Sequence, residues 1–417
     1  MKVLHFSDLH IGYERYSKST DLETGLDDRI LDFLNVFDEL INYAIKEDVD
    51  LVLFAGDAFK TRHPTPTHLR EFSKRLLKLT NNKIPVALVV GNHDIPAVKQ
   101  RATSLDIFPT MNIEKVTVID KLKLYTIETK NSGPIQIIGL PWPRFGTFTS
   151  SIRKNDPNMK VEEITQTIVN MFDSNIKIEL EKINKDIPCI FSGHLSVMEA
   201  KTSTETLMSI TNDPLLSTQF FIRPEFEYVG LGHIHKDQVL NENPPVIYSG
   251  SLERVDFGEK DDEKGFYICE LDTNKKQGER LIDYKKIKVS ARNFNEIKIH
   301  IPKNEIYPDK YILEKLSSEY IKDSIIRIEI ESTREHFESI NNPNIKKILS
   351  TAKNVVSIIP SFITEKETHE VKLSEDLGII ETFEKYLDNF KDIDDKRKKD
   401  LLEFGKEIIS EYESEND

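Results

Sequence analysis

The chain has 417 residues, a hydrophobic fraction of 38% and a formal net charge of −14. This length and composition allow a sizeable buried core, exclude a disordered or fibrous protein, and favour a large domain plus at least one smaller unit. No apolar run approaches the ~20 residues of a membrane span, and the N-terminus shows no secretory pattern, so we expect a cytoplasmic protein with no membrane contact.

The negative charge is concentrated toward the C-terminus. Residues 365–417 carry about −9 of the formal charge, which leaves about −5 for the preceding part. A net negative charge argues against a simple cationic DNA-binding protein, but this distribution still allows a locally basic face. The two cysteines, Cys189 and Cys269, lie in apolar runs, so we expect buried reduced thiols rather than a disulfide.

Short apolar and β-branched runs alternate with helix-like segments over the first two thirds of the chain. This alternation predicts an α/β domain with mainly buried strands. The predicted strands are 3–7, 51–55, 86–90, 135–140, 187–192, 228–231, 246–249 and 266–271. Apolar residues recur at helical spacing from Ile30 to Ile45, so we expect a helix that carries the chain back over the sheet between the first two strands.

The order of strands and helices restarts after about residue 290, which predicts a separate small domain over 291–364. Its expected elements are strands 297–301, 325–331 and 355–360 with helices 311–320 and 345–352 between them. Residues 365–375 are charged and lack an apolar period, which predicts a linker. Beyond it we expect two amphipathic helices, over 380–390 and 401–412, that either fold back on their own domain or dock onto a partner protein.

Polar side chains directly follow five of the predicted strands. The strands end in Asp8-Leu9-His10, Gly56-Asp57, Gly91-Asn92-His93-Asp94, Gly193-His194 and Gly232-His233-Ile234-His235. An α/β sheet builds its binding crevice at the carboxyl ends of its strands, and alternate residues of an extended segment project to one side. The glycines permit the tight turns and close backbone approach of a crowded site. We therefore expect these side chains to converge.

The converging donors outnumber what one metal ion accepts. They are two carboxylates, one amide and four imidazoles: Asp8, Asp57, Asn92, His10, His194, His233 and His235. Two divalent ions about 3.5 to 4 Å apart, bridged by one carboxylate and a hydroxide, account for the excess and suit an in-line attack on phosphorus. Oxygen and nitrogen donors without thiolate fit Mn²⁺, Fe²⁺ or Zn²⁺ and do not select among them.

Any one of these histidines alone is more simply explained as a satisfied polar side chain. Only the histidines taken together indicate a site, because five of the eleven fall at Gly-flanked strand ends. The remaining histidines are interpreted as structural: His5, His63, His68, His300, His336 and His369. Of these, His63 and His68 have the strongest claim to a functional role, since they lie in the Pro-rich loop after Asp57.

Together the five segments resemble the five motifs of the calcineurin-like metallophosphoesterases. Two longer stretches, Ser7 to Tyr13 and Tyr248 to Glu259, resemble more narrowly the SbcD-type nuclease subunit of DNA double-strand-break repair. The resemblance implies a metallophosphoesterase β-sandwich flanked by helices over 1–290 and a small α/β capping domain for DNA recognition over 291–364. It also implies a linker and C-terminal helices that bind a partner over 365–417.

Carried over residue by residue, the family pattern implies two metal ions that share Asp57 as a bridge. One ion is held by Asp8, His10, Asp57 and His235, and the other by Asp57, Asn92, His194 and His233. His93 matches the catalytic histidine that is not a ligand, which contacts the scissile phosphate and assists the leaving hydroxyl as a general acid. Asp94 is expected to orient His93, as carboxylates do for imidazoles.

The chain departs from the family pattern three residues after the bridging aspartate. Some archaeal members have a histidine there, whereas this chain has Lys60, so no role of that histidine is carried over. Lys60 and Arg62 either contact the phosphate backbone of a substrate or belong to a solvated loop.

Two further segments have a structural interpretation. Within Gly250 to Glu259, Arg254 is expected to pair with Glu253 or Asp256 and brace a loop beneath the site, in preference to contacting DNA. Trp142 lies between two prolines, and we interpret it as part of a packed rigid turn and not as a surface on which a base stacks.

The function implied by the resemblance is a manganese-dependent DNA exonuclease and endonuclease. It is expected to form a homodimer and to act with an SbcC-type ATPase that grips the C-terminal helices. One alternative is another metallophosphoesterase, either a protein phosphatase or a small phosphodiesterase, because the ligands dictate phosphoester chemistry and not substrate size. The other is a non-catalytic adaptor that holds DNA ends, against which the intact set of ligands argues.

Overall fold

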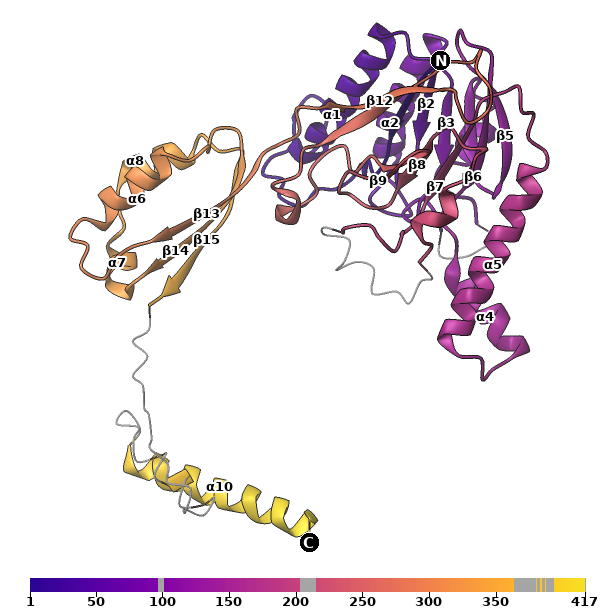
Figure 1. Ribbon diagram of the computed structural model, residues 1–417. Helices are drawn as coiled ribbons and strands as arrows, with labels where there is room; N and C mark the ends of the chain where they lie inside the picture. The colour runs from indigo at the N-terminus through magenta and orange to yellow at the C-terminus, as the bar shows by residue number, and fades with distance from the viewer. Residues whose placement is uncertain are drawn as a thin grey trace. The chain divides into compact units, whose positions relative to one another are not determined.

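The computed structural model describes residues 1–96, 101–202, 215–363, 380, 383, 384, 387 and 394–416. The chain divides into two compact units, Met1–Ser361 and Phe362–Asp417. The larger unit contains two six-stranded sheets and a three-stranded sheet (Figure 1). Among the helices of the described residues, none combines the length and the apolar character needed to cross a membrane.

The first sheet has the strand order β12-β11-β1-β2-β3-β4. Its strands are β1 (Lys2–Phe6), β2 (Leu51–Phe54), β3 (Val86–Val89), β4 (Val116–Ile119), β11 (Gly265–Leu271) and β12 (Leu281–Lys288). Strands β1 to β4 run parallel, whereas β11 is antiparallel to both β1 and β12. The predicted strands at β1, β2, β3 and β11 are confirmed, while β4 and β12 were not predicted.

The second sheet has the strand order β5-β6-β7-β8-β10-β9. Its strands are β5 (Lys123–Glu128), β6 (Pro134–Leu140), β7 (Cys189–His194), β8 (Val229–Gly232), β9 (Gln238–Glu242) and β10 (Pro245–Tyr248). The four central strands are parallel, and the edge strands β5 and β9 are antiparallel to their neighbours. The central strands were predicted. The edge strands β5 and β9 are partly exposed and contain several polar residues, so they lack the continuous apolar run of a buried strand.

A shared core joins the inner faces of the two sheets. It is built from alternate residues of both, such as Val3 and Leu53 from the first sheet and Ile137 and Ile190 from the second. Helices α1 (Asp28–Lys46) and α2 (Pro66–Asn81) cover the outer face of the first sheet, and α5 (Val161–Leu180) packs against that of the second, with α4 (Phe145–Asn155) beside α5 (Figure 1). The expected α/β sandwich flanked by helices is therefore confirmed.

The predicted helix between the first two strands is α1. It buries the apolar residues that recur at helical spacing, including Ile30, Leu34, Phe37 and Ile41. Helix α2 begins with Pro66 at its first position, where the missing N–H costs nothing, and the side chain of Thr65 accepts a hydrogen bond from the backbone of the third residue after it. Short helices α3 (Ile107–Thr110), η2 (Thr218–Phe221) and η3 (Phe257–Glu259) complete this part of the unit.

The three-stranded sheet lies between residues 294 and 362 and has the order β13-β14-β15. Its elements are β13 (Phe294–His300), α6 (Pro308–Ser317), β14 (Ile325–Ser332), α7 (Arg334–Ser339), α8 (Pro343–Leu349) and β15 (Asn354–Phe362). The predicted order of strands and helices is confirmed, with α7 as an addition. An isoleucine-rich core of its own, including Ile297, Ile312 and Ile328, holds these elements together.

The second unit contains α10 (Asp395–Asn416), which covers the helix predicted over 401–412. Phe404 and Ile408 are exposed on this helix. The predicted linker 365–375 lies outside the described residues, as does most of the helix predicted over 380–390.

Both cysteines are buried and unpaired, as predicted. Burial raises the pKa of each thiol above its usual value. Two of the histidines interpreted as structural have structural partners: His5 contacts the hydroxyl of Tyr228 at 2.9 Å, and His300 lies 2.8 Å from the carboxylate of Glu331.

Candidate metal centre

The candidate ligands follow strands that are neighbours in the two sheets. Asp8, Asp57 and Asn92 come just after the parallel strands β1, β2 and β3, and His194 ends β7. His233 and His235 follow β8, the neighbour of β7. The carboxyl ends of these strands meet at one edge of the sandwich, so the structure brings together all seven predicted donors.

The backbone at this edge adopts unusual conformations. Four candidate ligands have positive φ values, in the left-handed region that residues other than glycine rarely adopt. They are Asp8, His10, Asp57 and His233, with φ of 52°, 47°, 61° and 98°. Such conformations are costly and cluster at functional sites. Gly56 precedes the candidate bridge with a φ of 101°, and a Cβ at this position would lie 2.4 Å from the ring of His194. Only glycine therefore fits there.

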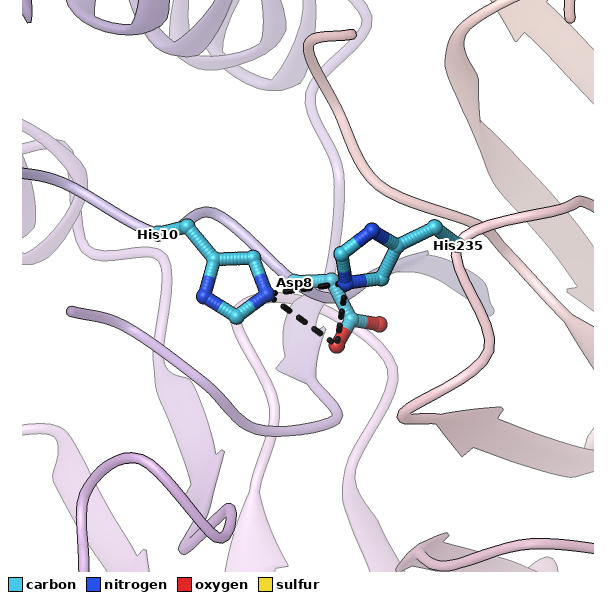
Figure 2. A group of neighbouring side chains, drawn as sticks. All are labelled: Asp8, His10 and His235. Carbon is cyan, nitrogen blue, oxygen red and sulfur yellow. Dashed lines mark hydrogen bonds and ion pairs between the residues drawn. The ribbon is translucent and has the colours of Figure 1, made fainter. Parts of the chain in front are cut away.

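The first group of donors comprises Asp8, His10 and His235, which point toward one another (Figure 2). The Nε2 atoms of His10 and His235 are 2.9 Å apart. They lie 3.9 Å and 4.0 Å from Asp8 Oδ1. All three residues are buried, so these polar atoms face one another with little access to water. The three side chains could hold one metal ion.

The second group comprises Asn92, His194 and His233. The amide oxygen of Asn92 lies 2.9 Å from His194 Nε2 and 3.2 Å from His233 Nδ1. Asp57 lies between the two groups, because its Oδ2 atom is 3.3 Å from His194 Nε2 and 3.9 Å from His10 Nε2. This is the position that a bridging carboxylate requires.

A buried side-chain network supports the first group, and sequence reasoning missed it. Glu259 Oε1 lies 2.8 Å from His235 Nδ1, and Glu259 Oε2 lies 2.8 Å from the ammonium of Lys264. Lys264 also donates to Ser251 Oγ and to the backbone carbonyl of His235. Burial opposes ionisation, but Lys264 and His235 hold the pKa of Glu259 well below its usual value. A carboxylate in this position fixes the orientation and tautomer of a metal-binding imidazole.

The second group is supported differently. His194 Nδ1 lies 2.7 Å from the carbonyl of Ala55, so it donates and leaves Nε2 facing the site. Despite burial, the carboxylate of Asp57 raises the pKa of His194 to about 9. Burial and the neighbouring His194 lower the pKa of His233 to about 3. The ring of Trp142 packs beside these imidazoles, with its centroid 4.8 Å from that of His233.

His93 lies at the site, but the prediction that Asp94 orients it is wrong. His93 Nδ1 contacts the carbonyl oxygen of Lys60 at 2.7 Å, so the ring is oriented by the backbone and not by Asp94. The Asp94 carboxylate instead accepts hydrogen bonds from the backbone N–H groups of Asp57, Ala58 and Gly91. Asp94 therefore fixes the two loops that carry the ligands. Burial, reinforced by the charge of Asp57, raises the pKa of Asp94 to about 7.

The structure also places the loop residues whose roles were left open. The Lys60 ammonium lies 5.0 Å from the centre of the Tyr13 ring, and burial lowers the pKa of Lys60. Arg62 and His63 are exposed. His68 is buried with its ring against Gly12, so its environment is that of a packing residue.

Arg254 braces a loop, as predicted, but through other partners. Its guanidinium donates to the backbone carbonyls of residues 262, 291 and 292. Glu253 instead lies 3.5 Å from Arg29 and accepts hydrogen bonds from the backbone of Arg292. Side-chain pairing inferred from sequence neighbours failed here because backbone carbonyls satisfy Arg254, whereas Glu253 is satisfied by Arg29 and by the backbone N–H groups of Arg254 and Arg292.

The donor set fits two divalent ions. It combines carboxylate, amide and imidazole groups without thiolate, a combination suited to Mn²⁺, Fe²⁺ or Zn²⁺. On one side of Asp57, the Nε2 atoms of two histidines face one another at 2.9 Å. On the other side, the amide oxygen of Asn92 faces two imidazoles. Each side thus offers several donor atoms to one ion. Two ions placed there would have separate ligand groups and one shared carboxylate.

Comparison with solved structures gives distant similarities. The chain resembles a dimetal phosphatase from Danio rerio, with 12% identity and a TM-score of 0.37, over 70% of this chain and 99% of that one. It resembles the protein TT1561 of Thermus thermophilus at 13% identity and a TM-score of 0.36, over 68% and 98%. It resembles GAP50, the anchor in the inner membrane complex of Plasmodium, at 13% identity and a TM-score of 0.32, over 70% and 89%.

The family comparison covers the candidate site itself. Residues 1–237 match the calcineurin-like phosphoesterases, which is more than half of the 417 residues and includes every candidate ligand from Asp8 to His235. This family uses a dimetal centre, in agreement with the two groups of donors around Asp57. The chain belongs to the calcineurin-like phosphoesterase family and is a metal-dependent phosphoester hydrolase.

Proposed function

We propose that this hydrolase is a DNA nuclease of the SbcD type, with exonuclease and endonuclease activity that depends on two Mn²⁺ ions. One observation carries the proposal. The segment that resembles these nucleases, Tyr248 to Glu259, contacts the metal centre through Glu259 and the small sheet through Phe257. Phe257 packs at 5.1 Å from the ring of Phe294, and Arg327 lies 4.2 Å above it. A small unit fastened to the loop beneath the site suits a polymer positioned by shape and backbone contacts.

Each of the two ions is proposed to bind one set of four side chains that includes Asp57. Asp8, His10, Asp57 and His235 hold one, and Asp57, Asn92, His194 and His233 hold the other. Ions bound there supply Lewis-acid activation of the phosphodiester and of the attacking water. The protein itself positions the carboxylates, since the backbone N–H of His93 donates to Asp57 Oδ1 at 2.8 Å and that of His233 donates to Asp8 Oδ2 at 3.0 Å.

His93 is the proposed general acid. Its Nδ1 atom donates to the Lys60 carbonyl, because a carbonyl oxygen can only accept, and Nε2 is left for proton transfer to the leaving hydroxyl. The ring centroid of His93 is 5.1 Å from that of His10, so the proton donor lies beside the first group of ligands. Asp94 acts by fixing the ligand loops.

The domain assignment is part of the same proposal. Residues 1–290 form the nuclease domain, 291–364 a capping domain that recognises DNA, and 365–417 a linker and helices that bind an SbcC-type ATPase. The exposed Phe404 and Ile408 on α10 give that partner apolar surface to cover. The active form is a homodimer.

Purified protein incubated with linear and hairpin DNA in Mn²⁺ tests the function. We expect cleavage of both by the native chain and little by the His93→Ala variant, with Gln166→Ala, an exposed residue of α5 that contacts Asn170, as the control. A phosphopeptide and bis-p-nitrophenyl phosphate are assayed beside the DNA. Turnover of the phosphopeptide without DNA cleavage would identify a phosphatase, and binding of DNA ends without hydrolysis of any substrate would identify an adaptor.

A further inference from the structure

A cavity of about 420 Å³ lies beside the metal centre and is not used by the proposed chemistry. Its size falls in the range of about 300 to 1,000 Å³ that is typical of small-ligand sites. Most of its wall is apolar or aromatic: Val90, Ile95, Leu122, Leu140, Pro141, Trp142, Pro143, Phe148 and Phe172. The cavity therefore fits a flat apolar group better than a sugar or a phosphate.

Trp142 connects this cavity to the metal centre. Its ring lines the cavity and lies 4.8 Å from the ring of His233 and 6.0 Å from that of His194, centroid to centroid. Its backbone N–H donates to the carbonyl of Val90 at 2.9 Å, two residues before Asn92. Residues 141–144 are irregular backbone and not the predicted rigid turn. Trp142 instead places its ring as a wall between the second group of ligands and an apolar cavity.

Cationic and hydroxyl groups border the same cavity. Arg144 lines it, and burial together with the nearby Arg62 guanidinium lowers the pKa of Arg144. Neither arginine forms an ion pair with any residue that the structure describes. Thr103 lines both this cavity and a second one of about 420 Å³ that includes Arg62, and within the described chain its buried hydroxyl has no hydrogen-bond partner. Two carboxylates also lie here: Asp120 lines the first cavity 3.9 Å from the Lys121 ammonium, and Asp106 lines the second and accepts a hydrogen bond from the backbone of Thr103. The two arginines without ion pairs and the unsatisfied hydroxyl are therefore the groups that could bind an anion.

From this juxtaposition we propose that the cavity beside Trp142 is a subsite for one unpaired nucleobase of the substrate strand, and that Arg62 and Arg144 hold the phosphate attached to it. The proposal rests on the proposed function for the identity of the ligand as nucleic acid. A flat base against the indole ring gains stacking energy whatever its sequence, because every base has a π-face. The subsite therefore selects strands whose terminal or looped-out base can leave the duplex, without reading which base it is.

The chain has one tryptophan, so a change in tryptophan fluorescence arises at Trp142, between this cavity and the second group of ligands. The experiment titrates the full-length protein, in EDTA to prevent cleavage, with single-stranded hexadeoxyadenylate and with a hexamer of the same backbone in which every residue is abasic. We expect the intact strand to change the fluorescence saturably and to bind about tenfold more tightly than the abasic strand, the size expected for one base stacked on an aromatic ring.

Variants separate the base from the phosphate. Thr147→Phe places a ring at the mouth of the cavity and should reduce the discrimination between the two strands to less than about twofold. Arg144→Ala should weaken both strands alike and keep the discrimination, whereas Arg153→Ala, an exposed arginine at the far end of α4, should change neither. Labelled strands measured by anisotropy give the affinities independently of the fluorescence.

Equal affinity of the intact and abasic strands would overturn the subsite, even if the protein cleaves DNA. Discrimination that survives Thr147→Phe unchanged would also overturn it, because the base would then bind elsewhere. If the native chain discriminates between the strands but cleaves no DNA in Mn²⁺, the nuclease proposal fails and the subsite stands.

Discussion

The two groups of ligands around Asp57 are built from similar donors but are supported by different means. The first group, Asp8, His10 and His235, rests on a buried side-chain network through Glu259 and Lys264. The second group, Asn92, His194 and His233, rests on the carbonyl of Ala55 and on packing against Trp142. The first half can therefore be altered by changing a side chain that is not itself a ligand, whereas the second depends on the backbone and on shape.

The supports of the two groups also contact different parts of the molecule. Glu259 ends the short helix η3, whose Phe257 packs with Phe294 and Ile325 of the small sheet. The first group is thus connected by side-chain contacts to the proposed capping domain. The second group instead borders the apolar cavity. The two halves are therefore expected to respond to different perturbations.

Removing the charge of Asp57 should disable both halves at once. Asp57→Asn is expected to lower the rate of phosphodiester hydrolysis by about 10³-fold or more, because the loss of Lewis-acid activation is worth several kcal/mol. Steady-state hydrolysis of bis-p-nitrophenyl phosphate in Mn²⁺ measures the effect. Asp50→Asn is the matched control, since Asp50 is buried and accepts backbone hydrogen bonds away from the site. A loss of less than about tenfold would exclude a bridging role for Asp57.

Glu259→Gln should affect the first half only. We expect about 10- to 100-fold weaker binding of one Mn²⁺ ion and unchanged binding of the other, because the partner that orients His235 loses its charge. The variant also removes the nearer of the two carboxylates beside the buried Lys264 and leaves only Asp262 at 3.6 Å, so it should be less stable.

Two further variants separate affinity from stability. Adding Lys264→Met should restore the thermal stability of Glu259→Gln but not its metal affinity. Glu253→Gln, a buried glutamate next to Arg29, should leave both Mn²⁺ affinities unchanged. Equal weakening of both ions by Glu259→Gln would contradict the separation into two halves.

Proton competition should act mainly on the second half. A metal-binding imidazole must be neutral, so the pKa of His194, raised to about 9, makes Mn²⁺ compete with a proton at lower pH. Affinity for one ion should fall by up to about tenfold per pH unit as the pH is lowered from 9 to 7. His10, whose pKa is lowered well below its usual value by burial and by His235, stays neutral over this range.

Stability of the metal-free protein should change in the opposite direction. Because the pKa of His194 is raised on folding, its contribution to stability is complete below about pH 6.5 and is lost as the pH rises through about 9. Mn²⁺ titrations and thermal unfolding at pH 7, 8 and 9 measure the two trends. Parallel pH dependence of both ions would be inconsistent with the different environments of the two groups.

Lys60→Ala should have the smallest effect. The backbone carbonyl that orients His93 remains, so hydrolysis of a small phosphodiester should be nearly unchanged. If the ammonium contacts a DNA phosphate, the slope of log affinity against log salt for duplex DNA should decrease in magnitude by about 0.9. Lys154→Ala, an exposed lysine on α4, is the control. An unchanged slope would assign Lys60 to a solvated loop.

The central strands and the convergence of the ligands could be predicted because both depend on local pattern. A buried parallel strand is a continuous apolar run, and a glycine followed by Asp, Asn or His at its end marks the site edge. The same reasoning missed β4, β5, β9 and β12, which are all edge strands. Of these, β5, β9 and β12 carry polar residues on their exposed faces. The order of elements in the small sheet was predictable for the same reason as the central strands.

The support of the site could not be predicted from the sequence. Glu259 is one of several acidic residues between 256 and 263, and only the tertiary fold selects it for contact with His235. The partner of His93 is a backbone carbonyl, which leaves no signature in residue identity. The cavity beside Trp142 joins segments from β3, β6 and α5 that are far apart in the chain, so a local prediction of a rigid turn gave no sign of it.

Locating the bound metal ions and their ligands shows whether Asp57 bridges two ions. Crystals of the full-length protein grown with Mn²⁺ and measured at the manganese edge should give two anomalous peaks per chain, one on each side of Asp57. The first should contact Asp8, His10 and His235, and the second Asn92, His194 and His233. A single peak, or two peaks that do not share the Asp57 carboxylate, would rule out a two-ion centre bridged by Asp57.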